Sequence, residues 1–92
     1  MNTLSLTAVP MLAARVRLQI DRVTAKPVLL YPEAVLELNE TAGEVLKLCD
    51  GQRTVAEIIA ALAAEFEATN DELTADVLAC LVELRGRNLV TA

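Results

Sequence analysis

Residues 38–55 read Leu-Asn-Glu-Thr-Ala-Gly-Glu-Val-Leu-Lys-Leu-Cys-Asp-Gly-Gln-Arg-Thr-Val, and this stretch holds one short helix between two clear signals. Asn39 is a favoured N-cap residue, while Thr41 followed three residues later by Glu44 offers a capping box as an alternative start. The apolar side chains that follow are spaced i, i+3, i+4, i+7, and they are Ala42, Val45, Leu46 and Cys49. This spacing is typical of one buried helical face. We therefore predict a helix over residues 39–50.

The second half of the same stretch ends this helix and begins another. Asp50 and Gly51 predict the end of the first helix, because glycine readily adopts the left-handed conformation that closes a helix. Thr54 is then a good N-cap for the next helix, with Glu57 at the reciprocal position of a capping box. A short helix, a tight stop and an immediate restart predict a helix-turn-helix-like corner.

Two longer amphipathic helices are predicted after this corner. The first covers residues 54–68, and its apolar stripe consists of Val55, Ile58, Ile59, Leu62, Ala63 and Phe66. The second covers residues 69–85, with Thr69 and Glu72 as its capping pair and Gly86 at its end. Its apolar face consists of Leu73, Val77, Cys80, Leu81 and Leu84.

Three short strands are predicted before the corner. Residues 15–21 alternate strictly between apolar and polar side chains, which is typical of a half-buried antiparallel strand. Residues 28–31 and residues 35–38 are shorter and mostly apolar. A sheet of this size is stable only when one face is covered, so we expect the helices to pack on it. We expect the C-terminal residues Leu89 and Val90 to dock on the same sheet.

Together these elements predict one α+β domain, a three-stranded antiparallel sheet followed by three helices, with a winged-helix-like arrangement. The chain of 92 residues divides into an N-terminal arm, residues 1–14, and a single domain, residues 15–92. The arm is too apolar for a solvated tail, so we expect it to pack on the domain or on a neighbouring chain. A disordered start is the alternative. Because so apolar a chain leaves apolar surface exposed, a homodimer formed by exchange of N-terminal strands is also expected.

The charge of the chain is divided unevenly. Residues 1–32 have a net charge of +3, whereas residues 33–92 have a net charge of −8. Within and just after the two longer helices, the only basic residues are Arg85 and Arg87. DNA recognition needs Lys and Arg side chains against the phosphates, so we expect no nucleic-acid partner. A winged-helix DNA-binding module and a purely structural oligomerisation module are the alternatives to the function given below.

Residues that carry catalysis or bind metals are scarce. The chain has no His, and its three glycines lie in or at the ends of predicted helices rather than in a phosphate-binding loop. Cys49 and Cys80 have no paired spacing, so we expect free thiols in a reducing compartment. We therefore predict a protein that is not an enzyme, with no catalytic residue, no metal site and no cofactor.

The sequence also predicts a cytoplasmic protein. The first basic residue is Arg15, so the start lacks the charged region of a secretory signal. The longest apolar run, residues 58–64, is seven residues long, whereas a membrane-spanning helix needs about 20. We expect no membrane partner.

A binding module remains. If the third strand lies at the edge of the sheet, its unpaired N–H and C=O groups can accept an extended peptide as a fourth strand. The cleft between this strand and the third helix would supply pockets for the peptide's side chains. Its lining would be Leu36, Val77, Cys80, Leu81 and Leu84. The alternative is that these side chains simply form the core.

Several segments resemble the PqqD family. They are Leu-Leu-Tyr-Pro-Glu at residues 29–33, Leu-Asn-Glu-Thr-Ala at 38–42, Leu-Cys-Asp-Gly at 48–51 and Arg-Thr-Val-Ala-Glu-Ile at 53–58, followed by Asp76, Val77, Leu81, Leu84 and Leu89. Pro10 and residues 15–21 fit the family's N-terminal part, so the resemblance covers nearly the whole chain from Pro10 onward.

The resemblance implies a small non-catalytic protein of pyrroloquinoline quinone biosynthesis. Such proteins bind the precursor peptide PqqA and present it to the radical SAM enzyme PqqE, which cross-links a Glu and a Tyr of that peptide. Because similar domains occur beside other radical enzymes, another modified-peptide precursor is the alternative partner.

The family's docking mode adds the leader peptide as a strand beside the third strand and against the third helix. On this chain, the resemblance implies a peptide edge made of Ala34, Val35, Leu36, Glu37 and Leu38. It implies a groove wall made of Val77, Cys80, Leu81, Leu84 and Arg85.

The first hairpin departs from the family pattern. Relatives often carry a glycine-containing turn where this chain has Val-Thr-Ala-Lys-Pro at residues 23–27. Pro27 has no backbone N–H to donate, so the sequence leaves the register of this hairpin open.

Overall fold

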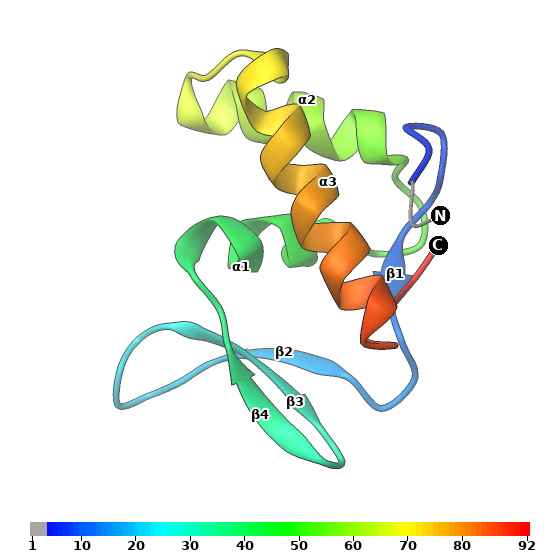
Figure 1. Cartoon of the computed structure of the whole chain (residues 1–92). Helices are drawn as coiled ribbons and strands as arrows, with labels where there is room; N and C mark the ends of the chain where they lie inside the picture. The colour runs from blue at the N-terminus through cyan, green and yellow to red at the C-terminus, as the bar shows by residue number, and fades with distance from the viewer. Residues whose placement is uncertain (1–3) are drawn as a thin grey trace.

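The computed structural model describes residues 4–92 and has three helices beside a small antiparallel sheet (Figure 1). Its elements in chain order are β1 (Met11–Leu12), β2 (Arg17–Ile20), β3 (Pro27–Tyr31), β4 (Ala34–Glu37), α1 (Glu40–Lys47), α2 (Val55–Phe66), α3 (Asn70–Gly86) and β5 (Val90–Thr91). Strands β2, β3 and β4 form one antiparallel sheet in that order. The predicted α+β class, with three strands followed by three helices, is confirmed.

The register of the first hairpin, which the sequence left open, aligns three leucines across the sheet. Leu18 pairs with Leu29, and Leu29 pairs with Leu36, so the same face of all three strands is apolar. Pro27 occupies the first position of β3 opposite Ile20, where its missing N–H interrupts no ladder inside the strand. The carbonyl of Pro27 still accepts a hydrogen bond of 2.9 Å from the N–H of Leu38.

Helix α1 starts at the first of the two predicted caps. The side-chain Oδ1 of Asn39 accepts a hydrogen bond of 2.7 Å from the N–H of Ala42. The predicted end at Asp50 is wrong by three residues, since the helix ends at Lys47. The chain leaves the helix early because Asp50 bridges to Met11 in an extended arrangement. The left-handed residue is still Gly51, with φ of 77°.

Both longer helices start with the predicted capping boxes. In α2, the Thr54 hydroxyl accepts from the N–H of Glu57 at 3.1 Å, and the Glu57 carboxylate accepts from the N–H of Thr54 at 2.8 Å. Thr69 and Glu72 make the same pair of bonds at the start of α3. Phe66, the last residue of the predicted stripe on α2, is 45% exposed. It therefore contributes less to the core than its spacing suggested.

The core lies between the sheet and the helices. Figure 1 shows the sheet at the bottom, α1 above it and α2 at the top, with α3 crossing from α2 down toward the sheet. Buried side chains from all these layers join in one cluster, whose fully enclosed members include Leu29, Val45, Val55, Ile58, Leu62, Val77 and Leu81. Within residues 4–92, no helix is both long and apolar enough to cross a membrane.

The N-terminal arm packs against the domain. The carbonyls of Leu6 and Ala8 accept hydrogen bonds of 3.0 and 2.9 Å from the N–H groups of Ala56 and Val55. These are first-turn donors of α2, which have no partner within their own helix. Residues 1–3, which the prediction placed in the arm, lie outside the described residues.

The C-terminal tail pairs with the arm. Strand β5 forms a two-stranded antiparallel ladder with β1, in which Leu12 pairs with Val90. Leu89 and Val90 are both buried, but the predicted docking on the three-stranded sheet is wrong. Strand β1, near the start of the described chain, therefore lies beside the C-terminal strand β5 (Figure 1).

Candidate peptide-binding groove

Strand β4 forms one open edge of the sheet. The N–H of Leu38 bonds to β3, and hydrogen-bonded positions alternate along an antiparallel ladder, so the backbone groups of residues 36 and 34 also face β3. The N–H and C=O groups of Val35 and Glu37 therefore point to the opposite side. No other segment of residues 4–92 pairs with that side of β4. This edge can accept a further strand.

A groove lies beside this edge, between β4, the start of α1 and one face of α3. It consists of two adjoining hollows of about 150 and 460 Å³. The smaller hollow is lined by Leu36, Glu37, Leu38, Asn39, Ala42, Cys80, Glu83, Leu84 and Arg87. The larger hollow shares Asn39, Ala42, Cys80 and Glu83 with it and adds Thr41, Asp76 and Ala79. The shared residues make the two hollows one continuous depression.

The floor of the groove is apolar. Leu36 lies on the β4 side of the groove and Cys80 on the α3 side. Both are partly buried, and both pack against the core cluster. Leu38 and Leu84 are buried more deeply, with 8% and 2% of their surface exposed. An extended ligand along β4 would turn alternate side chains toward this floor, because successive side chains of a strand point to opposite faces.

Only some of the predicted strand residues line the groove. Leu36, Glu37 and Leu38 line the smaller hollow. Val35 is 63% exposed and lines neither hollow, so its contribution to this edge is its backbone N–H and C=O. Ala34 also lies outside the lining, and its backbone groups face β3.

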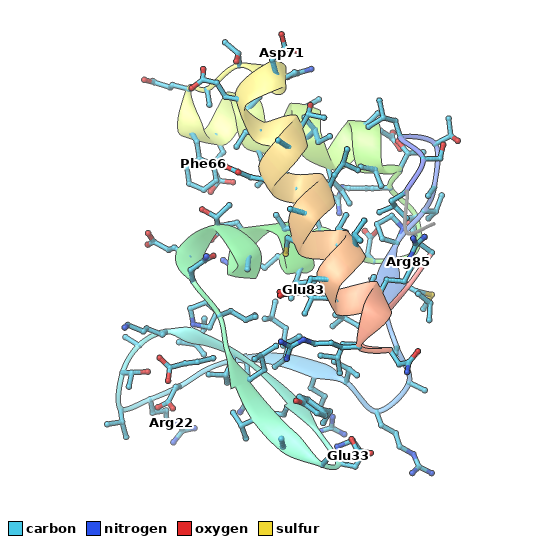
Figure 2. All side chains as sticks on the ribbon, in the orientation of Figure 1. Arg22, Glu33, Phe66, Asp71, Glu83 and Arg85 are labelled. Atoms are coloured by element: carbon cyan, nitrogen blue, oxygen red, sulfur yellow. The ribbon has the colours of Figure 1, made fainter. Side chains whose placement is uncertain are left out.

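Likewise, only some of the predicted residues of α3 line the groove. Cys80 and Leu84 line the groove. Val77 and Leu81 are fully buried, and they support the groove from within the core rather than lining it. Arg85 lines neither hollow, and Figure 2 shows it projecting from the side of α3 opposite Glu83.

The sequence prediction missed the charged rim of the groove. Asp76, Glu83 and Arg87 line it together with Cys80. These four positions are spaced by four, three and four residues, which is the spacing of one helical face. This signal was present in the sequence, but the predicted groove wall contained only the apolar residues of the third helix and Arg85.

The two cysteines behave as packing residues. Burial raises the pKa of the Cys80 thiol to about 11, and the nearby Glu83 carboxylate adds to the shift. Burial also raises the pKa of Cys49 to about 12. A thiol with so high a pKa stays protonated near neutral pH, and the thiolate is the form that attacks electrophiles or binds metals. Within residues 4–92, no cluster of three or more potential metal ligands occurs.

Comparison with known proteins identifies relatives over most of the chain. Residues 27–90 match the family model described as coenzyme PQQ synthesis protein D (PqqD). A PqqA binding protein of Rhodopseudomonas palustris strain TIE-1 is 42% identical over 89 residues, covering 97% of this chain and 87% of the relative. A PqqA binding protein of Pseudomonas aeruginosa strain UCBPP-PA14 is 50% identical over 66 residues, covering 72% of each chain.

Two solved structures share the fold. One is the NMR structure of the PqqD truncation of Methylobacterium extorquens PqqCD, described as a stand-alone recognition element for ribosomally synthesized and post-translationally modified peptides. It is 37% identical, with a TM-score of 0.86 over 99% of this chain and 98% of that one. The other, the crystal structure of PqqD from Xanthomonas campestris, is 42% identical, with a TM-score of 0.57 over 95% of this chain and 98% of that one. The chain therefore belongs to the PqqD family.

Proposed function

We propose that this protein is a non-catalytic peptide chaperone of pyrroloquinoline quinone biosynthesis that binds the precursor peptide PqqA. The peptide adds to β4 as a fourth strand and turns alternate side chains into the groove against α3. The observation that carries the proposal is the open edge at Val35 and Glu37 beside an apolar groove. Relatives of this chain are named PqqA binding proteins, which supports the same ligand.

Micromolar binding requires hydrogen bonds to the open edge of β4 and burial of apolar side chains in the groove. Val35 and Glu37 each offer one N–H and one C=O, and a backbone hydrogen bond contributes about 1 kcal/mol net. Micromolar affinity needs about 8 kcal/mol, so hydrogen bonds along this edge supply only about half. Burying an apolar side chain contributes roughly 1.5–3 kcal/mol, so two peptide side chains buried on the groove floor supply the other half of the binding free energy. The ligand is therefore an extended segment with apolar residues at alternate positions.

The chemistry on the bound peptide belongs to another protein. The Cys80 thiol in the groove is protonated near neutral pH, and the remaining floor is aliphatic. We propose that the protein presents the peptide to the radical SAM enzyme PqqE, as the family resemblance implies. The free thiols of Cys49 and Cys80 support a location in the cytoplasm.

Proline substitution at the open edge tests strand addition. Val35→Pro removes an N–H that β3 does not use, and proline is tolerated on an edge strand whose N–H faces solvent. We expect the variant to fold and to bind PqqA at least about tenfold more weakly, which corresponds to about 1.4 kcal/mol, measured by isothermal titration calorimetry.

Ile20→Pro provides the matched control. The N–H of Asp21 bonds to the carbonyl of Lys26, so the N–H of Ile20 faces the other open edge of the sheet, at β2. This variant should bind PqqA as the wild type does. Equal binding by the wild type and Val35→Pro, with both proteins folded, would refute strand addition at β4.

We also propose that the protein forms a homodimer by exchange of its N-terminal arm. The arm has exposed apolar side chains at Leu6, Val9 and Met11, which a second copy would cover. The Xanthomonas structure has a TM-score of only 0.57 at 42% identity, which supports a second arrangement within the family. Light scattering during size-exclusion chromatography should detect a dimer whose fraction rises with concentration. A monomer at every concentration would exclude it.

A further inference from the structure

The carboxylates and the guanidinium of the groove are distributed unevenly along it. Asp76 lines the end beside the start of α1, and Glu83 lies where the two hollows meet. Arg87 lies at the other end of the same helical face, where it also lines a neighbouring hollow of about 390 Å³ together with Arg15 and Glu33. Glu37 adds a further carboxylate to the rim on the strand side. Figure 2 shows Glu83 on the side of α3 that faces α1 and β4.

These charged groups are not engaged within the described part of the chain. Glu44 forms an ion pair with Lys47 and Asp50 forms one with Arg53, and both pairs lie outside the groove. No hydrogen bond or ion pair among residues 4–92 occupies the side chains of Asp76, Glu83 or Arg87. A ligand that covers the groove would partly desolvate them, and a complementary charge on the ligand would then be favoured.

We infer that the groove selects a peptide of defined charge order, with an Asp or Glu facing Arg87 and a Lys or Arg on the acidic side, between Glu83 and Asp76. The inference rests on the proposed function. Arg87 is four helical positions, or about 6 Å, from Glu83 and 11 positions, or about 16 Å, from Asp76, and an extended peptide covers these distances in about two and about five residues. The basic and acidic residues of the peptide therefore lie roughly two to five positions apart.

The charge order also fixes the direction of the peptide. Strand β4 runs from the Arg87 end of the groove toward the Asp76 end, because Glu33 lies just before it and Asn39 just after it. A peptide whose basic residue precedes its acidic residue therefore runs antiparallel to β4.

A charge-reversal experiment with PqqA tests the inference. Glu83→Lys should weaken binding roughly 5- to 20-fold at about 0.05 M salt, and the loss should shrink at about 0.5 M salt as screening increases. Glu67→Lys is the matched control, because Glu67 is exposed at the end of α2 and lines neither hollow. It should change the affinity less than about twofold.

The second half of the experiment varies the peptide. Each Lys or Arg of PqqA is changed to Glu in turn. One of these altered peptides should bind the Glu83→Lys variant more tightly than it binds the wild-type protein. The inference is wrong if Glu83→Lys binds like the control, or if no peptide change restores its affinity, or if the peptide has no basic residue in the bound segment. In each of these cases a loss of binding in Val35→Pro leaves the proposed function standing. If wild-type protein binds no PqqA at all, the proposed function itself fails.

Discussion

Gly43 fixes the distance between α1 and the sheet. It is buried, and a Cβ at this position would lie 2.6 Å from Cγ and 2.8 Å from Cβ of Pro27. The proline ring is rigid, so it cannot move aside as a flexible side chain would. Helix α1 can therefore lie this close to Pro27 only because residue 43 has no side chain.

The first prediction concerns this contact. Gly43→Ala should lower the free energy of unfolding by about 1–3 kcal/mol through overpacking, although alanine favours a helix by about 1 kcal/mol in the absence of a clash. Gly86→Ala is the matched control, since nothing lies within 4 Å of a Cβ there, and it should be neutral or stabilising. Urea denaturation measures both. A Gly43→Ala variant as stable as the wild type would show that the helix and the proline are not in close contact.

Asp50 makes stability depend on pH. Hydrogen bonds from the backbone N–H groups of Gln52 and Arg53, together with the Arg53 charge, hold the pKa of its carboxyl below the ordinary value of 3.8. A carboxyl with a depressed pKa stabilises the fold above its unfolded pKa, and this contribution disappears as the pH falls through the folded pKa.

Asp50→Asn tests that contribution. The variant should be less stable than the wild type at neutral pH, and the difference should shrink as the pH falls below 3.8. The measurement is the urea midpoint of both proteins across this range. A difference that stays constant with pH would mean that the charge of Asp50 is not involved.

At the scale of helices and strands, the capping boxes define where α2 and α3 begin. Thr54→Ala removes an N-cap and should cost about 1 kcal/mol of stability. Thr41→Ala is the comparison, because Thr41 belongs to the capping box that α1 does not use, and its stability should change by less than about 0.5 kcal/mol. Thermal unfolding of the two variants separates them. An equal loss in both would show that α1 also depends on Thr41.

The sequence predicted features that depend on residues close together in the chain, and it did not predict features that depend on distant ones. The caps at Thr54 and Thr69 were predictable because each connects residues three apart. The pairing of β1 with β5 was not, because nothing local in either segment specifies a partner about 80 residues away. Helical spacing likewise placed Val77 and Cys80 on one apolar face, but it could not tell which side chain ends in the core and which in the groove.

At the scale of the whole molecule, the layers leave β4 accessible. The N-terminal arm and the C-terminal tail pair with each other through β1 and β5. Helix α1 covers the inner face of the sheet near β2 and β3. Strand β4 thus remains at the edge, with α3 facing it across the groove. Strand addition is the binding mode that this arrangement favours, because it uses the backbone groups that the fold leaves without a partner strand.

Amide hydrogen exchange at β4 tests this account most directly. The N–H of Leu36 is bonded to β3, so it should exchange slowly with or without PqqA and serve as an internal reference. The N–H groups of Val35 and Glu37 should exchange fast in the free protein and become at least about tenfold slower when PqqA is saturating, because the added strand bonds to them. Fast exchange of both amides in the fully bound protein would contradict strand addition.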